Sequence, residues 1–316
     1  QAITTDALPA SRLTFLQRGT HTQKEYLRFF PSLNASYQLR EDLIARAAVY
    51  QSVGRPNFNQ YAGGITLPDT ESPPGPGNRL VVNHAGIKAW SARTFNARFE
   101  YYFEGVGQVA IGGFTRDYEN FFASTVIPAS PEFLELYGVD PATYGGYEVS
   151  TQANIPGTVR TTGLDVSYKQ SLAFLPRWAR GVHVFANASA QRATGDAAEN
   201  FSGYVPRTFN WGLSLTREKF NLRANWNYRS RQRLDDVAAG ASIEPGTYTW
   251  GAKKLSLDLQ GEYTFRPGLA LFTNLRNVND GTEDYAIAGP STPAHAQFRS
   301  RQDFGSLWTF GLKGSF

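Results

Sequence analysis

Apolar and polar side chains alternate along much of this chain. Between positions 220 and 229 the even-numbered residues are Phe, Leu, Ala, Trp and Tyr, and the odd-numbered ones are Asn and Arg. A period of two puts every apolar side chain on one face of an extended strand. The alternation returns at about 33–39, 43–49, 95–103, 107–122, 164–168, 182–188, 209–215, 255–265, 269–275 and 308–316. The pattern predicts roughly eleven strands, or twelve if residues 11–17 form another.

The connections between these segments alternate in length. Short turns are expected near Glu41, Gly105, Pro176, Glu218 and Pro267. Long segments rich in Gly, Pro, Asp and Ser follow Gln51, Phe122, Ala193, Arg231 and Val278. Long loops at one end of a sheet and tight turns at the other are typical of outer-membrane barrels, whereas a soluble sandwich or propeller has shorter strands and less turn asymmetry. We therefore predict an all-β fold, an antiparallel transmembrane β-barrel.

Two of the long connections have recognisable content. The first runs from about Gly54 to Ser91 and includes Ser-Pro-Pro-Gly-Pro-Gly-Asn at 72–78, a sequence that no strand or helix would contain. In the second, Ser130 can cap a helix that begins with Pro131 and stops at Gly138. The second loop is therefore expected to carry a short helix.

Composition agrees with a barrel rather than a helical membrane protein. The mean hydropathy is -0.38, and no apolar run approaches the roughly 18 residues that a spanning helix needs. Strands of a membrane barrel are half polar, so this low hydropathy does not count against them. The 16 Tyr, 22 Phe and 6 Trp are sufficient for aromatic girdles at the membrane boundaries.

Charge and chemistry exclude several other classes. The 31 basic and 27 acidic residues are interspersed, so no nucleic-acid partner is predicted. Cysteine is absent, the four histidines are far apart, and no Gly-x-Ser-x-Gly sequence occurs, so neither an enzyme nor a bound metal or cofactor is expected. Methionine is absent too, and Gln1 is therefore not expected to be the natural start of the protein.

Five motifs stand in a fixed order along the chain. They are VGRPNF at 53–58, EYYF at 100–103, NIPG with TGLD within 154–165, TNLRNVND at 273–280 and LWTFGLKGSF at 307–316. In order and spacing they resemble the C-terminal half of the barrel in TonB-dependent outer-membrane receptors, from about Phe30 to the terminal aromatic Phe316. Asp165 departs from the glutamate usual in that family, and 279–281 departs in a loop.

This resemblance implies an architecture. Members of the family have a 22-stranded barrel filled by an N-terminal plug, and no plug is recognisable in residues 1–316. The chain is therefore expected to be the C-terminal part of a receptor barrel, since unpaired strand edges are costly in lipid and would need earlier strands. Closure of these strands into a smaller barrel is the alternative.

The resemblance also implies a function at the cell outer membrane. A receptor of this type takes up a scarce large solute, such as a siderophore, a vitamin or a glycan, with energy from the inner membrane. Its expected partners are outer-membrane lipid, the small-molecule or glycan ligand, an inner-membrane energy-coupling protein reached through the plug region, and in some cases a surface lipoprotein. A plugless porin-like or adhesion barrel is the alternative function.

Candidate ligand-contacting residues come from the polar face and the loops. On the polar face Arg98, Arg223, Asn225 and Asn227 are expected to line a lumen. The charged group Arg229, Arg231 and Arg233, next to Asp235 and Asp236, is a candidate site for an anionic ligand or a solvated surface cluster.

Aromatic residues have two possible roles outside the strands. The loop residues Phe58, Tyr61, Tyr144, Tyr147 and Tyr248 are suited to stacking on a ligand or to anchoring at the membrane boundary. At the C-terminus the resemblance implies an assembly signal made of Trp308, Phe310 and Phe316.

Overall fold

The computed structural model describes residues 29–314 apart from 58–63, 76, 84–86, 104–106, 177–179, 200, 202 and 238–242. The strand predicted at 11–17, the aromatic residues Phe58 and Tyr61, and the terminal Phe316 lie outside these ranges. Within the described ranges, no helix has the length and apolar character needed to cross a membrane.

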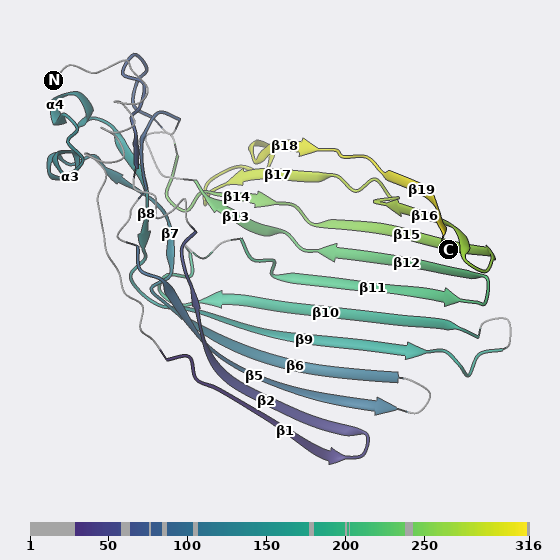
Figure 1. Ribbon diagram of the computed structural model, residues 1–316. Helices are drawn as coiled ribbons and strands as arrows, with labels where there is room; N and C mark the ends of the chain where they lie inside the picture. Colours follow the sequence, from purple (N-terminus) through teal and green to yellow (C-terminus); the bar gives the residue numbers. More distant parts are fainter. Residues whose placement is uncertain are drawn as a thin grey trace.

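An eleven-stranded antiparallel sheet makes up most of the described structure (Figure 1). Its strands are β1 (Ser32–Arg40), β2 (Leu43–Gly54), β5 (Trp90–Phe103), β6 (Gly107–Glu119), β9 (Val159–Ser171), β10 (Val182–Thr194), β11 (Arg207–Thr216), β12 (Phe220–Arg229), β15 (Lys254–Arg266), β16 (Leu269–Arg276) and β19 (Leu307–Gly314). They follow one another in the sheet in chain order, and the described residues leave β1 and β19 as its two edges. The predicted strand number and antiparallel arrangement are confirmed.

Cross-strand register gives the sheet one apolar and one polar face. Ala224 of β12 pairs with Leu213 and Leu259, whereas the next residue, Asn225, pairs with Gly212 and Asp258. On the apolar face Leu164 is 62% exposed, and Leu222 and Leu271 are each 48% exposed. Large apolar side chains exposed over a whole face need a nonaqueous neighbour. The sheet therefore has the two-faced character of a membrane-barrel wall.

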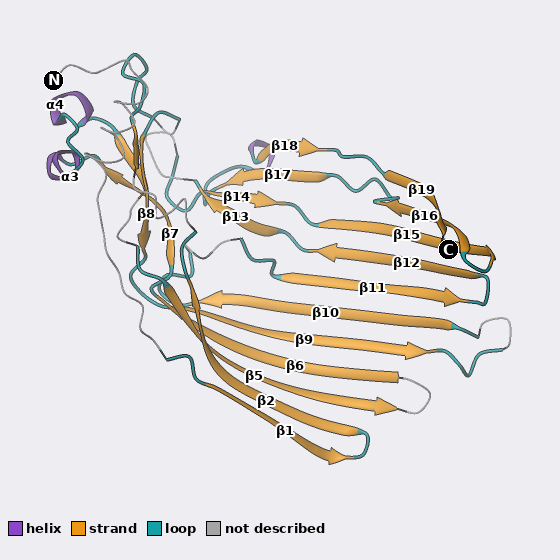
Figure 2. Cartoon of the chain, viewed as in Figure 1, coloured by secondary structure: helices purple, strands orange, loops and turns teal. Residues whose placement is uncertain are grey.

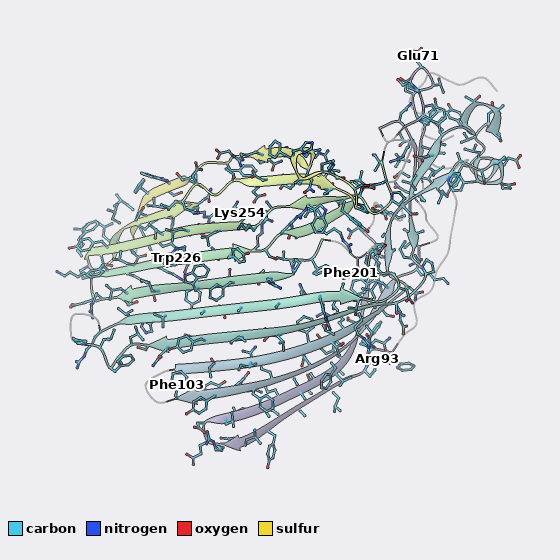
Figure 3. All side chains as sticks on the ribbon, turned by 180° about the vertical axis from the view of Figure 1, so that it is seen from behind. Glu71, Arg93, Phe103, Phe201, Trp226 and Lys254 are labelled. Atoms are coloured by element: carbon cyan, nitrogen blue, oxygen red, sulfur yellow. The ribbon has the colours of Figure 1, made fainter. Side chains whose placement is uncertain are left out.

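Short turns and long loops are segregated to opposite ends of the sheet (Figure 2). The hairpin turn at 41–42 and the connections 217–219 and 267–268 are short. The connection 172–181 at the same end is longer than the short turn predicted near Pro176. The other long connections leave the opposite end, and Figure 3 shows Phe103 at the turn end and Glu71 at the far tip of a loop. The predicted asymmetry is confirmed.

The two longest loops contain more strand than the sequence indicated. The first carries β3 (Gly64–Thr66) and β4 (Leu80–Asn83), so its interpretation as a plain loop was incomplete. The strand predicted at about 107–122 ends earlier, as β6 at Glu119, because Asn120 has a φ of 54°. A positive φ interrupts an extended strand. A further strand, β7 (Phe122–Pro128), begins within the second loop.

These loops join into one folded unit with its own core. Strands β3, β4, β8 (Glu148–Asn154) and β7 form a four-stranded sheet, in which β4 and β8 are parallel. Two helices, α3 (Pro131–Leu136) and α4 (Pro141–Tyr144), complete it, and α3 begins as predicted because Ser130 Oγ accepts from the backbone N of Phe133. Its most buried side chains are Leu80, Val82, Leu134 and Val149, none more than 1% exposed. We call this unit the loop domain.

A second loop sheet extends the β12–β19 side of the main sheet at its loop end (Figure 1). It consists of β13 (Gln232–Asp236), β14 (Tyr248–Gly251), β17 (Glu283–Ala288) and β18 (Phe298–Gln302), with the short helix η3 (Ala294–Ala296) before β18. All three pairings in this sheet are antiparallel. The chain thus folds its long connections into ordered structure at one end of the wall.

Candidate functional site

An ion-pair network crosses the polar face between β2, β5 and β9. Glu100, only 8% exposed, lies 3.1 Å from Arg46 Nε and 3.1 Å from Arg98 Nε, and it accepts a 2.9 Å hydrogen bond from Tyr102 Oη. Arg98 Nη1 also lies 3.4 Å from Asp165 Oδ2. The predicted polar-face residue Arg98 therefore lies on that face, and two carboxylates balance its charge.

A hollow of about 490 Å³ opens beside this network, between β1, β2, β5 and β6. Its lining includes the guanidinium groups of Arg46, Arg98 and Arg116 and the carboxylate of Asp165. Gly112 provides the space for this carboxylate, because a Cβ there would lie 2.8 Å from Asp165 Oδ2. The guanidinium groups of the hollow are suited to hydrogen-bonding oxygen atoms of a bound solute.

A second hollow of about 600 Å³ lies nearer the turn end of the polar face. Its lining carries Lys169, His183 and Arg223, with no carboxylate among its described residues. The Arg223 guanidinium lies 5.5 Å from the Phe185 ring centroid, and Arg223 Nε donates to Asn225 Oδ1 at 3.1 Å. The predicted residues Arg223 and Asn225 thus contact each other in a cationic part of the wall.

Asn227 lies two residues after Asn225 in β12, on the same face of the sheet. Its Nδ2 donates to Asp258 Oδ2 at 3.2 Å, across the β12–β15 pair. Asp258 Oδ1 in turn accepts from the backbone N of Asn277 at 2.9 Å. Asn227 therefore belongs to a hydrogen-bond chain that reaches the end of β16.

The three arginines expected to form one anionic-ligand site take separate partners. Arg229 Nη2 lies 3.6 Å from Glu283 Oε1, the Arg231 guanidinium stacks 4.2 Å from the Trp250 ring, and the Arg233 guanidinium stacks 4.4 Å from the Tyr248 ring. Stacking on an aromatic face leaves guanidinium edges available for hydrogen bonds. Binding of an anion here stays a prediction.

Arg233 has a structural role that the sequence did not indicate. Its Nη2 donates to the carbonyl oxygens of Ala198, at 2.6 Å, and Phe201, at 3.1 Å. The Arg233 carbonyl accepts from Gly203 N at 2.8 Å. The β10–β11 loop is therefore tied to the β13–β14 hairpin at one residue. Tyr248 is partly buried below it, and this burial raises the pKa of its phenol.

A polar groove of about 530 Å³ lies between the loop domain and this hairpin. Arg79, Glu148 and Ser150 line it from the side of the loop sheet opposite its core, and Asp236 lines it from β13. Arg79 Nη2 and Glu148 Oε2 are paired at 2.8 Å. Burial raises the pKa of Asp236. The groove offers both signs of charge within one recess, and such convergent polar groups can orient a polar solute.

The aromatic loop residues divide between packing and the groove. Tyr144 packs against the core of the loop domain, with its ring 6.0 Å from that of Tyr147. Tyr147 lines the groove, and its hydroxyl donates to the carbonyl oxygens of Asp69 and Ser72, each at 3.2 Å. Contact with a ligand through Tyr144 or Tyr248 remains a prediction.

An aromatic cluster at the loop end of the wall was not anticipated. The Phe201 ring lies 5.0 Å from Tyr118, 5.0 Å from Phe121 and 5.7 Å from Tyr204, and Tyr118 lies 5.5 Å from Trp90. Figure 3 shows Phe201 where the strands of the wall give way to the loops. The cluster brings together aromatic residues that flank different strands, so only their clustering near strand ends was visible in the sequence.

The C-terminal strand is an edge with an apolar face. Trp308 is 59% exposed and Phe310 is 64% exposed, on the same face as Leu271, which pairs with Leu312. At the opposite edge, all nine residues of β1 are exposed. In hydrocarbon, backbone groups at such edges require strand partners. Trp308 and Phe310 are therefore placed to contact lipid beside a pairing edge.

The polar hollows offer groups that can bind a solute. Among the described residues, no group of three or more His, Asp, Glu or Cys could hold a metal ion. The polar hollows instead present guanidinium, amide and hydroxyl groups. Their chemistry is the recognition of oxygen-rich or anionic groups.

Comparison with known proteins identifies the family. Residues 4–278 match the family model described as "TonB dependent receptor-like, beta-barrel". Because the match covers most of the chain, this protein belongs to the TonB-dependent receptor β-barrel family. Members of this family are transport receptors of the outer membrane. A comparison with curated proteins found no match to the sequence.

Solved structures agree on the fold. The ferric enterobactin receptor PfeA of Pseudomonas aeruginosa, in complex with enterobactin, is 17% identical, with a TM-score of 0.63 over 91% of this chain and 40% of that one. The ferric citrate transporter FecA in the unliganded form (17% identity, TM-score 0.55, 90% and 38% coverage) and the copper transporter OprC (14%, 0.56, 91% and 39%) are similar too. The chain thus spans about 40% of the length of these receptors.

Proposed function

We propose that this chain is the C-terminal part of the barrel of an outer-membrane receptor that takes up a scarce large solute with energy from the inner membrane. The observation that carries this proposal is the register of the eleven-stranded sheet, which gives one apolar and one polar face. Such a wall separates lipid from an aqueous lumen. The family match and the coverage of about 40% of the solved receptors support the assignment of the chain to part of a larger barrel.

The solute binds first at the loop end of the wall. The groove between the loop domain and the β13–β14 hairpin, with Arg79, Glu148 and Asp236, is the proposed point of capture. Below it, the hollows that contain Arg98 and Arg223 continue the polar path along the wall. Their guanidinium groups favour a solute with carboxylate, catecholate or phosphate oxygens.

A siderophore is the solute class that this path supports best. The structures similar in fold are named for enterobactin, ferric citrate and copper, all solutes that are metals or carry one. Anionic chelators present the oxygen groups that guanidinium forks bind in pairs. A vitamin or a glycan is the other solute class consistent with a large polar path.

The proposed partners follow from this function. The apolar face contacts outer-membrane lipid, and an inner-membrane energy-coupling protein acts through an N-terminal plug region of the whole receptor. A surface lipoprotein assisting at the loop end is a further proposed partner.

Uptake by cells tests the proposal. A strain deleted for the whole gene, and the same strain carrying it, are offered a panel of 55Fe-loaded catecholate and carboxylate siderophores with and without a protonophore. We expect gene-dependent uptake of at least one chelate that the protonophore abolishes. Uptake that persists with the protonophore, together with a steadily open conductance of the full-length protein in planar bilayers, would contradict it and favour a passive porin.

A further inference from the structure

The apolar face of the wall contains a recess that the transport function does not use. Its volume is about 380 Å³, and its lining comes from β12, β15 and β16. The residues that line it are Phe220, Leu222, Gly261, Glu262, Tyr263, Leu271, Phe272 and Thr273. We call it the lipid-face notch.

A glycine creates the floor of the lipid-face notch. Gly261 pairs with Leu222 on one side and with Thr273 on the other, on the apolar face. A Cβ at Gly261 would lie 3.0 Å from Thr273 Cγ2 and 3.4 Å from Leu222 Cδ2, so even a small side chain would begin to fill the recess. In the adjacent cross-strand row Tyr263 pairs with Phe220 and Leu271, and these larger side chains border the recess. The notch is therefore an apolar recess open to the membrane.

The two turns that adjoin the notch in sequence carry basic residues. Phe220 follows Lys219 directly, and Tyr263 is followed closely by Arg266. The two turns are adjacent, because Thr264 N donates to Lys219 O at 2.7 Å. Lys219 and Arg266 are both exposed, and neither forms a salt bridge among the described residues. With Arg217, these two turns carry three basic residues against the single acidic residue Glu218.

We propose that the lipid-face notch binds one phospholipid of the turn-side leaflet. One acyl chain lies over Gly261, where it contacts protein on three sides rather than one, and this increases its dispersion contacts. The phosphate lies between Lys219 and Arg266, which supply opposite charge at the boundary. The shape of the notch thus selects the acyl chain of the lipid, and the basic residues select its phosphate. An anionic headgroup is therefore favoured.

Lipid retention by the full-length receptor tests this proposal. The protein is extracted from membranes in a mild detergent, and its bound phospholipids are counted by native mass spectrometry. We expect Gly261→Leu to remove one retained phospholipid and Lys219→Gln with Arg266→Gln to weaken retention of phosphatidylglycerol about tenfold, as expected for the loss of two phosphate contacts. Inorganic phosphate should not displace the lipid, whereas phosphatidylglycerol vesicles should restore it.

Gly113→Leu is the matched control for the glycine substitution. Gly113 is on the same apolar face, paired with Ala97 and Leu164, and is distant from the notch. It should leave retention unchanged, and heat-dependent gel mobility reports whether each variant is folded. Equal retention by the wild type and the Lys219→Gln/Arg266→Gln variant would overturn the proposal, even if Gly261→Leu does not fold. A protein dimer occupying the notch in place of lipid would overturn it as well.

Discussion

Arg233 lies over the ring of Tyr248, with its guanidinium carbon 4.4 Å from the ring centroid. In this position its Nη2 reaches the carbonyl oxygens of Ala198 and Phe201. One side chain thus joins the β13–β14 hairpin to the β10–β11 loop, and through Phe201 to the aromatic cluster at the loop end of the wall. The loops around the proposed capture groove are mechanically connected rather than independent.

Removal of this tie should loosen the β10–β11 loop. In Arg233→Ala the two charged hydrogen bonds and the stacking are lost, at a local cost of about 2 kcal/mol. Amide exchange at Ala198 and Gly203 is then expected to accelerate roughly thirtyfold. Hydrogen exchange measures it, and Arg231→Ala is the control, because Arg231 stacks on Trp250 without a hydrogen bond from its guanidinium to this loop. Equal acceleration in both variants would show that the tie does not depend on Arg233.

The loop domain should unfold locally when a side chain of its core is truncated. Leu134 is fully buried, so Leu134→Ala is expected to cost about 3 kcal/mol through a residual cavity. Limited proteolysis should cleave this variant within 131–149 while the wall stays intact. Val81→Ala, at a position 46% exposed, is the control and should be cleaved at the wild-type rate. Unchanged resistance of Leu134→Ala would mean that this core does not stabilise the loop domain.

Acid should weaken the second loop sheet through Glu283. A 2.9 Å hydrogen bond from Lys254, with further help from Tyr285 and Arg229, lowers the pKa of the Glu283 carboxyl. A carboxyl whose pKa is lowered by folding stabilises the folded state above its unfolded pKa of about 4.3, and this stability is lost as pH falls through the lowered value. Amide protection of β17 is therefore expected to fall below about pH 4.

Substitution separates Glu283 from other acid effects. Glu283→Gln should give lower protection of β17 at pH 7 and reduce the fall on acidification. Part of the fall should remain, because the hydrogen bond from Arg301 also lowers the pKa of Asp284 in the same strand. Glu71→Gln, at the exposed tip of another loop (Figure 3), should reproduce the wild-type profile. A wild-type acid profile in Glu283→Gln would assign the effect to another group.

Asn277 should be necessary for the connection between β16 and β19. Its φ is 53°, its Nδ2 donates to Gly305 O at 2.9 Å, and its Oδ1 accepts from Gly281 N at 2.9 Å. Asn277→Ala loses these bonds and strains the backbone, at about 3 kcal/mol, whereas Asn277→Gly keeps the conformation and should cost about 2 kcal/mol. Urea unfolding of the receptor in detergent, followed by gel mobility, should rank wild type, Gly and Ala in that order. Equal stability of Ala and Gly would exclude backbone strain.

The wall could be predicted from sequence because each strand position faces either lipid or the polar side of the sheet, and its residue type shows which. In β12 the alternation of Ala224, Asn225 and Trp226 records this directly, and register in the sheet follows from it. The helix α3 was predicted for a similar local reason, its cap at Ser130. The ends of strands were harder to predict. Phe121 and Phe122 continue the aromatic pattern beyond Asn120, whose positive φ interrupts the strand, so the sequence did not show where β6 ends.

For the candidate site, the sequence predicted only which face of the sheet each residue occupies. Alternation placed Arg98 and Arg223 on the polar side, but their partners depend on strands distant in sequence, such as Asp165 for Arg98. The arginines at 229, 231 and 233 are close in sequence, yet the chain passes from β12 into β13 there and gives each one another partner. The tie from Arg233 to Phe201 spans 32 residues, a contact that no local pattern encodes.

The most direct measurement of the central claim is cysteine accessibility along β12 in the whole receptor, in intact outer membranes. The chain contains no cysteine, so each substitution from Leu222 to Asn227 introduces a single thiol into it. The account predicts that a water-soluble maleimide labels positions 223, 225 and 227, while a lipid-soluble reagent labels 222, 224 and 226. Labelling of both sets by the water-soluble reagent alone would contradict a wall between lipid and lumen.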